Sequence, residues 1–200
     1  MEREKITAKE FYEAFVGALK AEEALGQYKS SPEWTAVLSR VINEKVLSKI
    51  FDLKTNKEYF RIDSIGWKGH PDWTGGKDSF KKYDKTSSLQ LNEYYWNLEV
   101  AVEYENNYRD WTNEFIKLCH VKCGLKVVIG YAPHDQRGKD MEKLELIAGH
   151  MRNLKYGRLG KDEQFLVILG NCKKEVYESF EDIDFRAYVY DGEKFKRLVL

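Results

Sequence analysis

The sequence is poor in proline and cysteine and contains no long hydrophobic run. It holds three prolines and three cysteines, whereas 14% of its 200 residues are aromatic. Few prolines and many aromatic residues exclude a disordered chain, and this length suits one domain over residues 1–200. No apolar run could cross a bilayer and we find no signal peptide, so we expect no membrane partner. With an odd number of cysteines, the expected location is the reducing cytoplasm.

The sequence also lacks net charge, because 33 basic residues balance 33 acidic ones. The total therefore argues neither for nor against a polyanionic partner, and only the local charge distribution is informative. Residues 92–114 hold six acids and one arginine, whereas residues 136–161 hold seven basic residues and three acids. In residues 68–91, lysines are interleaved with aromatic residues, as in loops that bind nucleic acid, although such loops are more often simply solvated. The lysines expected to contact nucleic acid are Lys68, Lys77, Lys81 and Lys82.

One stretch, residues 96–106, alternates between apolar and polar residues with the period of a β-strand. Its polar face carries three carboxylates, those of Glu99, Glu103 and Glu105. These carboxylates repel each other unless solvent, a lysine or a cation neutralises them, so this face is the best candidate for a metal site. A half-solvated antiparallel strand produces the same pattern and is the alternative explanation.

Hydrophobic periodicity and turn signals predict the helices and strands. We expect helices over residues 7–25, 31–50, 108–123 and 140–155, and strands over residues 58–67, 96–106, 125–131, 164–170, 185–190 and 195–200. Residues 52–57 are expected to form a polar turn, and the Asp191-Gly192 pair a hairpin turn. Ile50, Met141 and Leu154 are among the apolar helix residues expected to face the core.

The order of these elements predicts an α/β fold, a three-layer α/β/α sandwich with a mixed central sheet. The strand at 96–106, the helix at 108–123 and the strand at 125–131 would form a right-handed parallel crossover. Residues 1–31 would form an extra N-terminal helix packed on the core at 33–131. Residues 132–200 would add a helix, a strand and a C-terminal hairpin that complete the sheet.

Two further acids occupy unusual positions. Asp63 lies in the middle of an aromatic and β-branched strand, where aspartate is disfavoured. A buried carboxylate there needs a partner, either Arg61 on the same face or a metal ion. Glu44 lies at the edge of the apolar stripe of helix 31–50, a position that also suits an ordinary solvated acid.

The cysteines permit an alternative metal site. Cys119, His120 and Cys123 are spaced closely enough to bind zinc. No second Cys/His pair follows at the spacing of a zinc finger, however, and helical cysteines are more often small core residues. We therefore favour the carboxylate site.

The acids of the helix and the two strands together resemble the motif of the restriction-endonuclease-like PD-(D/E)xK superfamily. In that superfamily a helix often carries a glutamate, the second strand an aspartate, and the third strand a (D/E)-x-K pair. Glu44, Asp63 and Glu103 match these acids in turn, and Glu105 stands at the lysine position. The chain also departs from the pattern in having no proline before Asp63. The resemblance covers residues 33–131.

The resemblance implies a Mg²⁺- or Mn²⁺-dependent nuclease that hydrolyses phosphodiester bonds of DNA or RNA. It implies that Asp63, Glu103 and the carbonyl of Tyr104 bind the metal, and that Glu105 orients the attacking water. Lys117, on the following helix, could supply the charge that the strand lacks. We expect Glu99 to be a structural partner, for example of Arg61.

Two other functions stay open at this point. Because glutamate replaces the lysine, the same scaffold suits a non-catalytic binding or assembly module. Paired acids that include Glu99 or Glu103 also suit a glycoside hydrolase, although no sugar-binding cleft is recognisable. The oligomeric state is open too, with a homodimer among the alternatives.

Overall fold

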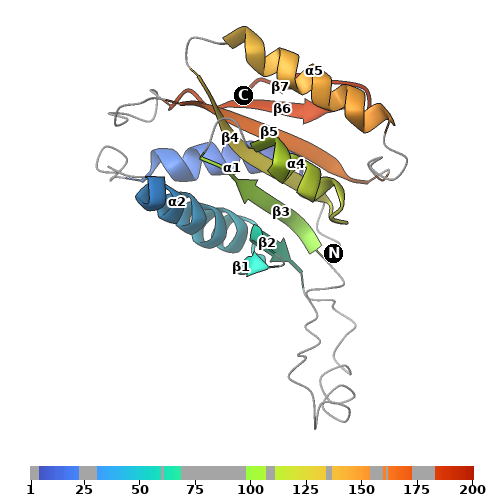
Figure 1. Ribbon diagram of the computed structural model, residues 1–200. Coiled ribbons are helices and arrows are strands. Elements are labelled where there is room, and N and C mark those ends of the chain that lie inside the picture. The colour runs from blue at the N-terminus through green and yellow to red at the C-terminus, as the bar shows by residue number, and fades with distance from the viewer. Residues whose placement is uncertain are drawn as a thin grey trace, which may run out of the picture.

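The computed structural model describes residues 5–22, 31–59, 61–68, 98–106, 111–133, 137–153, 160, 162–172 and 183–200. These residues form a mixed α/β fold with a seven-stranded mixed sheet and four helices (Figure 1). Within this part of the chain, no helix is both long and apolar enough to cross a membrane.

The helices and strands follow the predicted order, with one additional strand at the start of the sheet. The helices are α1 (Ala8–Lys20), α2 (Ser31–Arg40) with its direct continuation η2 (Val41–Ile50), α4 (Trp111–Cys119) and α5 (Arg137–Asn153). The strands are β1 (Lys54–Tyr59), β2 (Ile62–Trp67), β3 (Leu98–Tyr104), β4 (Leu125–Pro133), β5 (Gln164–Cys172), β6 (Arg186–Tyr190) and β7 (Phe195–Leu198).

The strands lie side by side in the order in which they occur in the chain. β1, β2 and β3 are antiparallel, β3, β4 and β5 are parallel, and β5, β6 and β7 are antiparallel again. Helix α4 connects β3 to β4, so the predicted parallel crossover is confirmed. The predicted C-terminal hairpin is also confirmed, with Tyr190 paired with Phe195 around the turn.

The sheet separates two hydrophobic cores, because successive strand residues point to opposite faces. Val100 and Val102 of β3 belong to the core that contains α1, α2 and η2. Ala101, between them, belongs to the core that contains α4 and α5. Figure 1 shows α1 and α2 on one face of the sheet and α4 and α5 on the other. The strand at 96–106 therefore alternates as predicted over its described part, and the apolar strands around it lie in one sheet.

The predicted polar turn at 52–57 is wrong, because β1 occupies Lys54–Tyr59. This strand lies at the edge of the sheet and its described side chains are mostly exposed, so its sequence need not be apolar. The predicted strand at 58–67 is correspondingly shorter, since Glu58 and Tyr59 belong to β1 and Arg61, with a positive φ angle of 64°, lies in the turn before β2. Arg61 thus lies in a turn rather than on a strand face beside Asp63.

The second helix also differs from the prediction, because its C-terminal half is π-helical. The N–H of Phe51 donates to the carbonyl of Val46, five residues back, and this wider turn changes which residues face the sheet. Leu47 is buried, whereas Ile50, expected to face inward, is 46% exposed. On α5, Met141 is 37% exposed rather than buried. Leu154 lies outside the described residues.

Candidate metal and catalytic site

Asp63 and Glu103 come from neighbouring antiparallel strands. Ser64 of β2 pairs with Val102 of β3, so the next step along this register places Asp63 opposite Glu103. Both side chains lie on the face that carries α4, because Ala101, two residues before Glu103, packs in that core. Adjacent antiparallel strands thus bring together two acids that lie 40 residues apart in the sequence.

Asp63 is held by the backbone of the neighbouring strand. Its Oδ2 accepts a hydrogen bond from the N–H of Tyr104 at 2.8 Å. Burial raises the pKa of Asp63, and this hydrogen bond opposes the rise because it favours the charged carboxylate. The bond fixes the orientation of Asp63 beside the end of β3.

Glu103 is the most deeply buried acid of this site, with 1% of its side chain exposed. Burial raises its pKa to about 9, and the negative charge of Asp63 contributes to the rise. Each carboxyl group shifts the pKa of the other, since Glu103 lowers the pKa of Asp63 and Asp63 raises that of Glu103. No N–H or O–H group of the described residues makes a well-aligned hydrogen bond to either Glu103 oxygen.

Lys117 of α4 provides the cation of this site. Its Nζ lies 2.8 Å from Oε1 of Glu103 and also contacts the Glu114 carboxylate. Lys117 Nζ donates a hydrogen bond of 2.8 Å to the carbonyl of Arg61 as well. Partial burial alone would lower the pKa of Lys117, but Glu103 and Glu114 outweigh it and raise that pKa. The ammonium group is therefore charged and held among three oxygens.

This arrangement fits a hard divalent cation. Such ions bind carboxylate and carbonyl oxygens and keep several water molecules. Asp63, Glu103 and the carbonyl of Tyr104 would supply these donors, with Lys117 beside one of the two Glu103 oxygens. In the part of the chain that the structure describes, no group of three or more His, Cys, Asp or Glu side chains could hold a metal ion by itself. A bound ion would therefore rely on backbone oxygen and water in addition to the two acids.

Three other acids were predicted near this pair or beside it. Glu44 is exposed on η2, which packs on the opposite face of the sheet. Glu105 follows the end of β3, where its N–H donates to the carbonyl of Ile129 at 2.9 Å. The expectation that Glu99 pairs with Arg61 is not met, since its Oε1 lies 4.0 Å from Nζ of Lys68.

Of the four lysines expected to bind nucleic acid, Lys68 is the one that the structure describes, at the end of β2. Its ammonium group contacts the carboxylate of Glu99 on β3. Lys77, Lys81 and Lys82 lie outside the described residues.

The cysteine site expected as an alternative is not favoured by the structure. Burial raises the thiol pKa of Cys119 to about 11 and that of Cys123 to about 12, and these residues do not form a group that could hold a metal ion in the described part of the chain. Cys123 lies beyond the end of α4, and its thiol contacts the carbonyl of Leu125 at 3.4 Å. His120 is exposed at the C-terminal end of the same helix.

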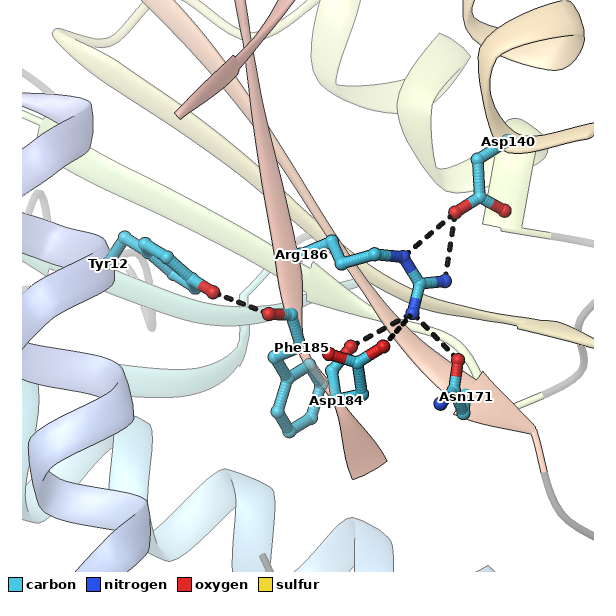
Figure 2. A network of polar contacts seen from close by, with 6 residues as sticks. All are labelled: Tyr12, Asp140, Asn171, Asp184, Phe185 and Arg186. Carbon is cyan, nitrogen blue, oxygen red and sulfur yellow. Dashed lines mark hydrogen bonds and ion pairs between the residues drawn. The ribbon is translucent and has the colours of Figure 1, made fainter. Parts of the chain in front are cut away.

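A second polar cluster was not predicted from the sequence. Figure 2 shows Arg186, 6% exposed, with its guanidinium group enclosed by acceptors. It donates to Asp140 of α5 at 2.8 and 3.1 Å, to Asn171 of β5 at 2.7 Å, and to Asp184. Several of its N–H groups are used within the protein, so this cluster joins α5, β5 and β6 rather than presenting a binding site. Its residues are far apart in the sequence, and no spacing predicts their contact.

Comparisons with models of known protein families, with curated proteins and with solved structures found no match.

Proposed function

We propose that this protein is a metal-dependent nuclease whose core from α2 to β4 has the restriction-endonuclease-like arrangement. The order of elements supports the proposal: a helix, three antiparallel strands, a crossover helix and a parallel strand. The acids occupy corresponding places, with Asp63 on the second strand and Glu103 near the end of the third.

The observation that carries the proposal is the position of Lys117. The sequence has Glu105 where the superfamily has its lysine, which favours a loss of activity. The ammonium group of Lys117 lies 2.8 Å from Glu103. A lysine from the crossover helix thus supplies the positive charge beside the two acids that the strand itself does not provide.

Each residue of the site would have its own role in phosphodiester hydrolysis. Asp63, Glu103 and the Tyr104 carbonyl would hold Mg²⁺ or Mn²⁺, which polarises the phosphate and lowers the pKa of a bound water. Glu103 must lose its proton to serve as a ligand, and the positive charge of Lys117 favours that loss. Lys117, which is 34% exposed, can also reach toward a phosphate at the surface. Lys68, together with Lys77, Lys81 and Lys82, would bind the nucleic acid backbone.

The non-catalytic binding module is the second candidate. It is favoured by the raised pKa of Glu103, because an acid that keeps its proton at neutral pH holds no metal. The glycoside hydrolase is not favoured, because Asp63 and Glu103 are close enough for each to shift the pKa of the other. Glycosidases instead separate their acids by about 5 Å or more to admit the sugar and a water.

Calorimetric titration with Mn²⁺ tests the proposal directly. Wild-type protein should bind Mn²⁺, and Asp63→Asn and Glu103→Gln should each abolish binding. Glu99→Gln is the matched control, because Glu99 lies on the same strand but pairs with Lys68, and it should bind like wild type. Absence of Mn²⁺ binding by the wild-type protein would contradict the nuclease and support the binding module.

The same variants are then assayed for cleavage. Single- and double-stranded DNA and RNA are incubated with wild-type protein and Mn²⁺. Cleavage should require Asp63 and Glu103 and should survive Glu99→Gln. Metal binding without cleavage of any of these forms would contradict the proposed activity.

A further inference from the structure

A second set of polar side chains lies directly behind the candidate site, on the opposite face of β2 and β3. Ser64 follows Asp63 in β2, and Tyr104 follows Glu103 in β3, so their side chains point toward α2 and η2. Ser39 of α2 and Asn43 of η2 meet them from the helix. We refer to Ser39, Asn43, Ser64 and Tyr104 as the Tyr104 cluster.

The contacts within this cluster connect the helix to both strands. Asn43 Nδ2 donates to Oγ of Ser64 at 2.7 Å and to the carbonyl of Ser39 at 2.8 Å. Burial raises the pKa of the Tyr104 phenol, and the hydroxyl groups of Ser39 and Ser64 oppose this rise by hydrogen bonding that favours the charged phenolate. Each residue of the cluster is thus hydrogen-bonded to at least one other.

Burying this polar cluster lowers the stability of the folded protein compared with apolar side chains in the same place. Ser64 is fully buried, Asn43 is 2% exposed, and Asn43 Oδ1 has no hydrogen-bond partner among the described residues. A buried polar atom without a partner costs about 1–3 kcal/mol. Asn43 also lies in the π-helical segment, a rare conformation that is frequent at functional sites.

Tyr104 connects this cluster to the candidate site through its own backbone. Its side chain is held by the cluster on one face of the sheet, and its N–H donates to Asp63 on the other face at 2.8 Å. Its carbonyl is the proposed third metal donor. We infer that the Tyr104 cluster positions the Tyr104 peptide, and through it Asp63, for metal binding. The part of this inference that concerns metal binding rests on the proposed function.

The test uses two substitutions that remove single hydroxyl groups from the cluster. Tyr104→Phe keeps the ring, and Ser39→Ala places the best helix former in a helix, so both should fold. Tyr12→Phe is the matched control. Its hydroxyl donates to the carbonyl of Phe185 at 2.6 Å, in the same core but away from the site (Figure 2).

Two measurements are made on each variant. The first is the Mn²⁺ dissociation constant by calorimetry, which should rise on the order of tenfold or more in Tyr104→Phe and Ser39→Ala, as for other partners of metal ligands. The second is hydrogen exchange at the Tyr104 amide without metal. Exchange should be faster in both variants than the change in global stability explains. Tyr12→Phe should alter neither quantity beyond its effect on global stability.

The outcomes separate this inference from the proposed function. Unchanged Mn²⁺ affinity in both cluster variants would overturn the inference and leave the metal site standing. If wild-type protein bound no Mn²⁺ while the Tyr104 amide still exchanged faster in the cluster variants, the proposed function would fail, and the positioning of the Tyr104 peptide would be upheld. Amide exchange that follows global stability in all three variants would overturn the inference in either case.

Discussion

Replacing Glu103 with glutamine should make the stability of the protein less dependent on pH. The pKa of this acid rises from 4.5 to about 9 on folding, so between these values the folded protein holds a proton that the unfolded chain has released. The free energy of unfolding of the wild-type protein should therefore decrease as the pH rises through this window. Below pH 4.5 both states are protonated and the effect vanishes, and above about pH 9 the loss is complete.

The size of the effect follows from the same two values. At 1.36 kcal/mol per pH unit, the rise from 4.5 to about 9 corresponds to a ceiling of about 6 kcal/mol. Local opening that admits water to the carboxylate reduces this amount, so we expect a loss of a few kcal/mol. Glutamine has nearly the same shape but no proton to release, so the loss should be largely absent in Glu103→Gln.

The assay is urea unfolding followed by circular dichroism at intervals from pH 5 to pH 9. The quantity compared is the difference in unfolding free energy between Glu103→Gln and wild type, which should grow in favour of the variant as the pH rises. Glu99→Gln, with a partly exposed acid on the same strand, should keep the wild-type dependence. A constant difference between Glu103→Gln and wild type across this range would refute the argument that Glu103 is buried as the neutral acid.

Three further predictions test other parts of the structure. Lys117→Met should abolish cleavage while Mn²⁺ still binds in calorimetry, although more weakly because Lys117 favours the charged form of Glu103, and complete loss of both would contradict a role of Lys117 at the phosphate. Arg186→Met should lower the unfolding free energy by about 3–5 kcal/mol, because Asp140 is left buried and unpaired, and should leave Mn²⁺ binding unchanged. Gly130→Ala should destabilise by about 1–3 kcal/mol in urea unfolding, because its Cβ would lie 2.7 Å from Cγ of Trp111, and wild-type stability would show that α4 shifts freely.

Much of the fold could be predicted because the buried elements have strong periodic patterns. β3, β4 and β5 are rich in apolar residues, and the helices between them are amphipathic, so the parallel crossovers were predictable. β1 could not be predicted, because an edge strand forms through backbone hydrogen bonds and its polar sequence resembles a turn. The inward face of η2 was missed for a different reason, since a π-helix does not follow the 3.6-residue period.

The candidate site could be predicted only where its residues follow the strand period. The alternation of β3 placed Glu103 on one face, and the unusual position of Asp63 in a strand identified it. The contact of Lys117 with Glu103 depends on how α4 packs across the sheet, which no local pattern records. The same holds for Asn43, because its contact with Ser64 joins a helix to a strand 21 residues away.

The destabilisation caused by burying Glu103 gives the bound-cation proposal a further argument beside the position of Lys117. A buried acid with a pKa near 9 destabilises the folded protein at neutral pH, and a glutamine or leucine would fill the same space without that cost. Lys117 does not remove the cost, because the pKa stays raised even with its ammonium group 2.8 Å away. A divalent cation would remove it, since a bound metal favours the charged carboxylate. Perturbed acids of this kind are concentrated at functional sites, and the raised pKa of Glu103 therefore supports the proposed cation over a purely structural role.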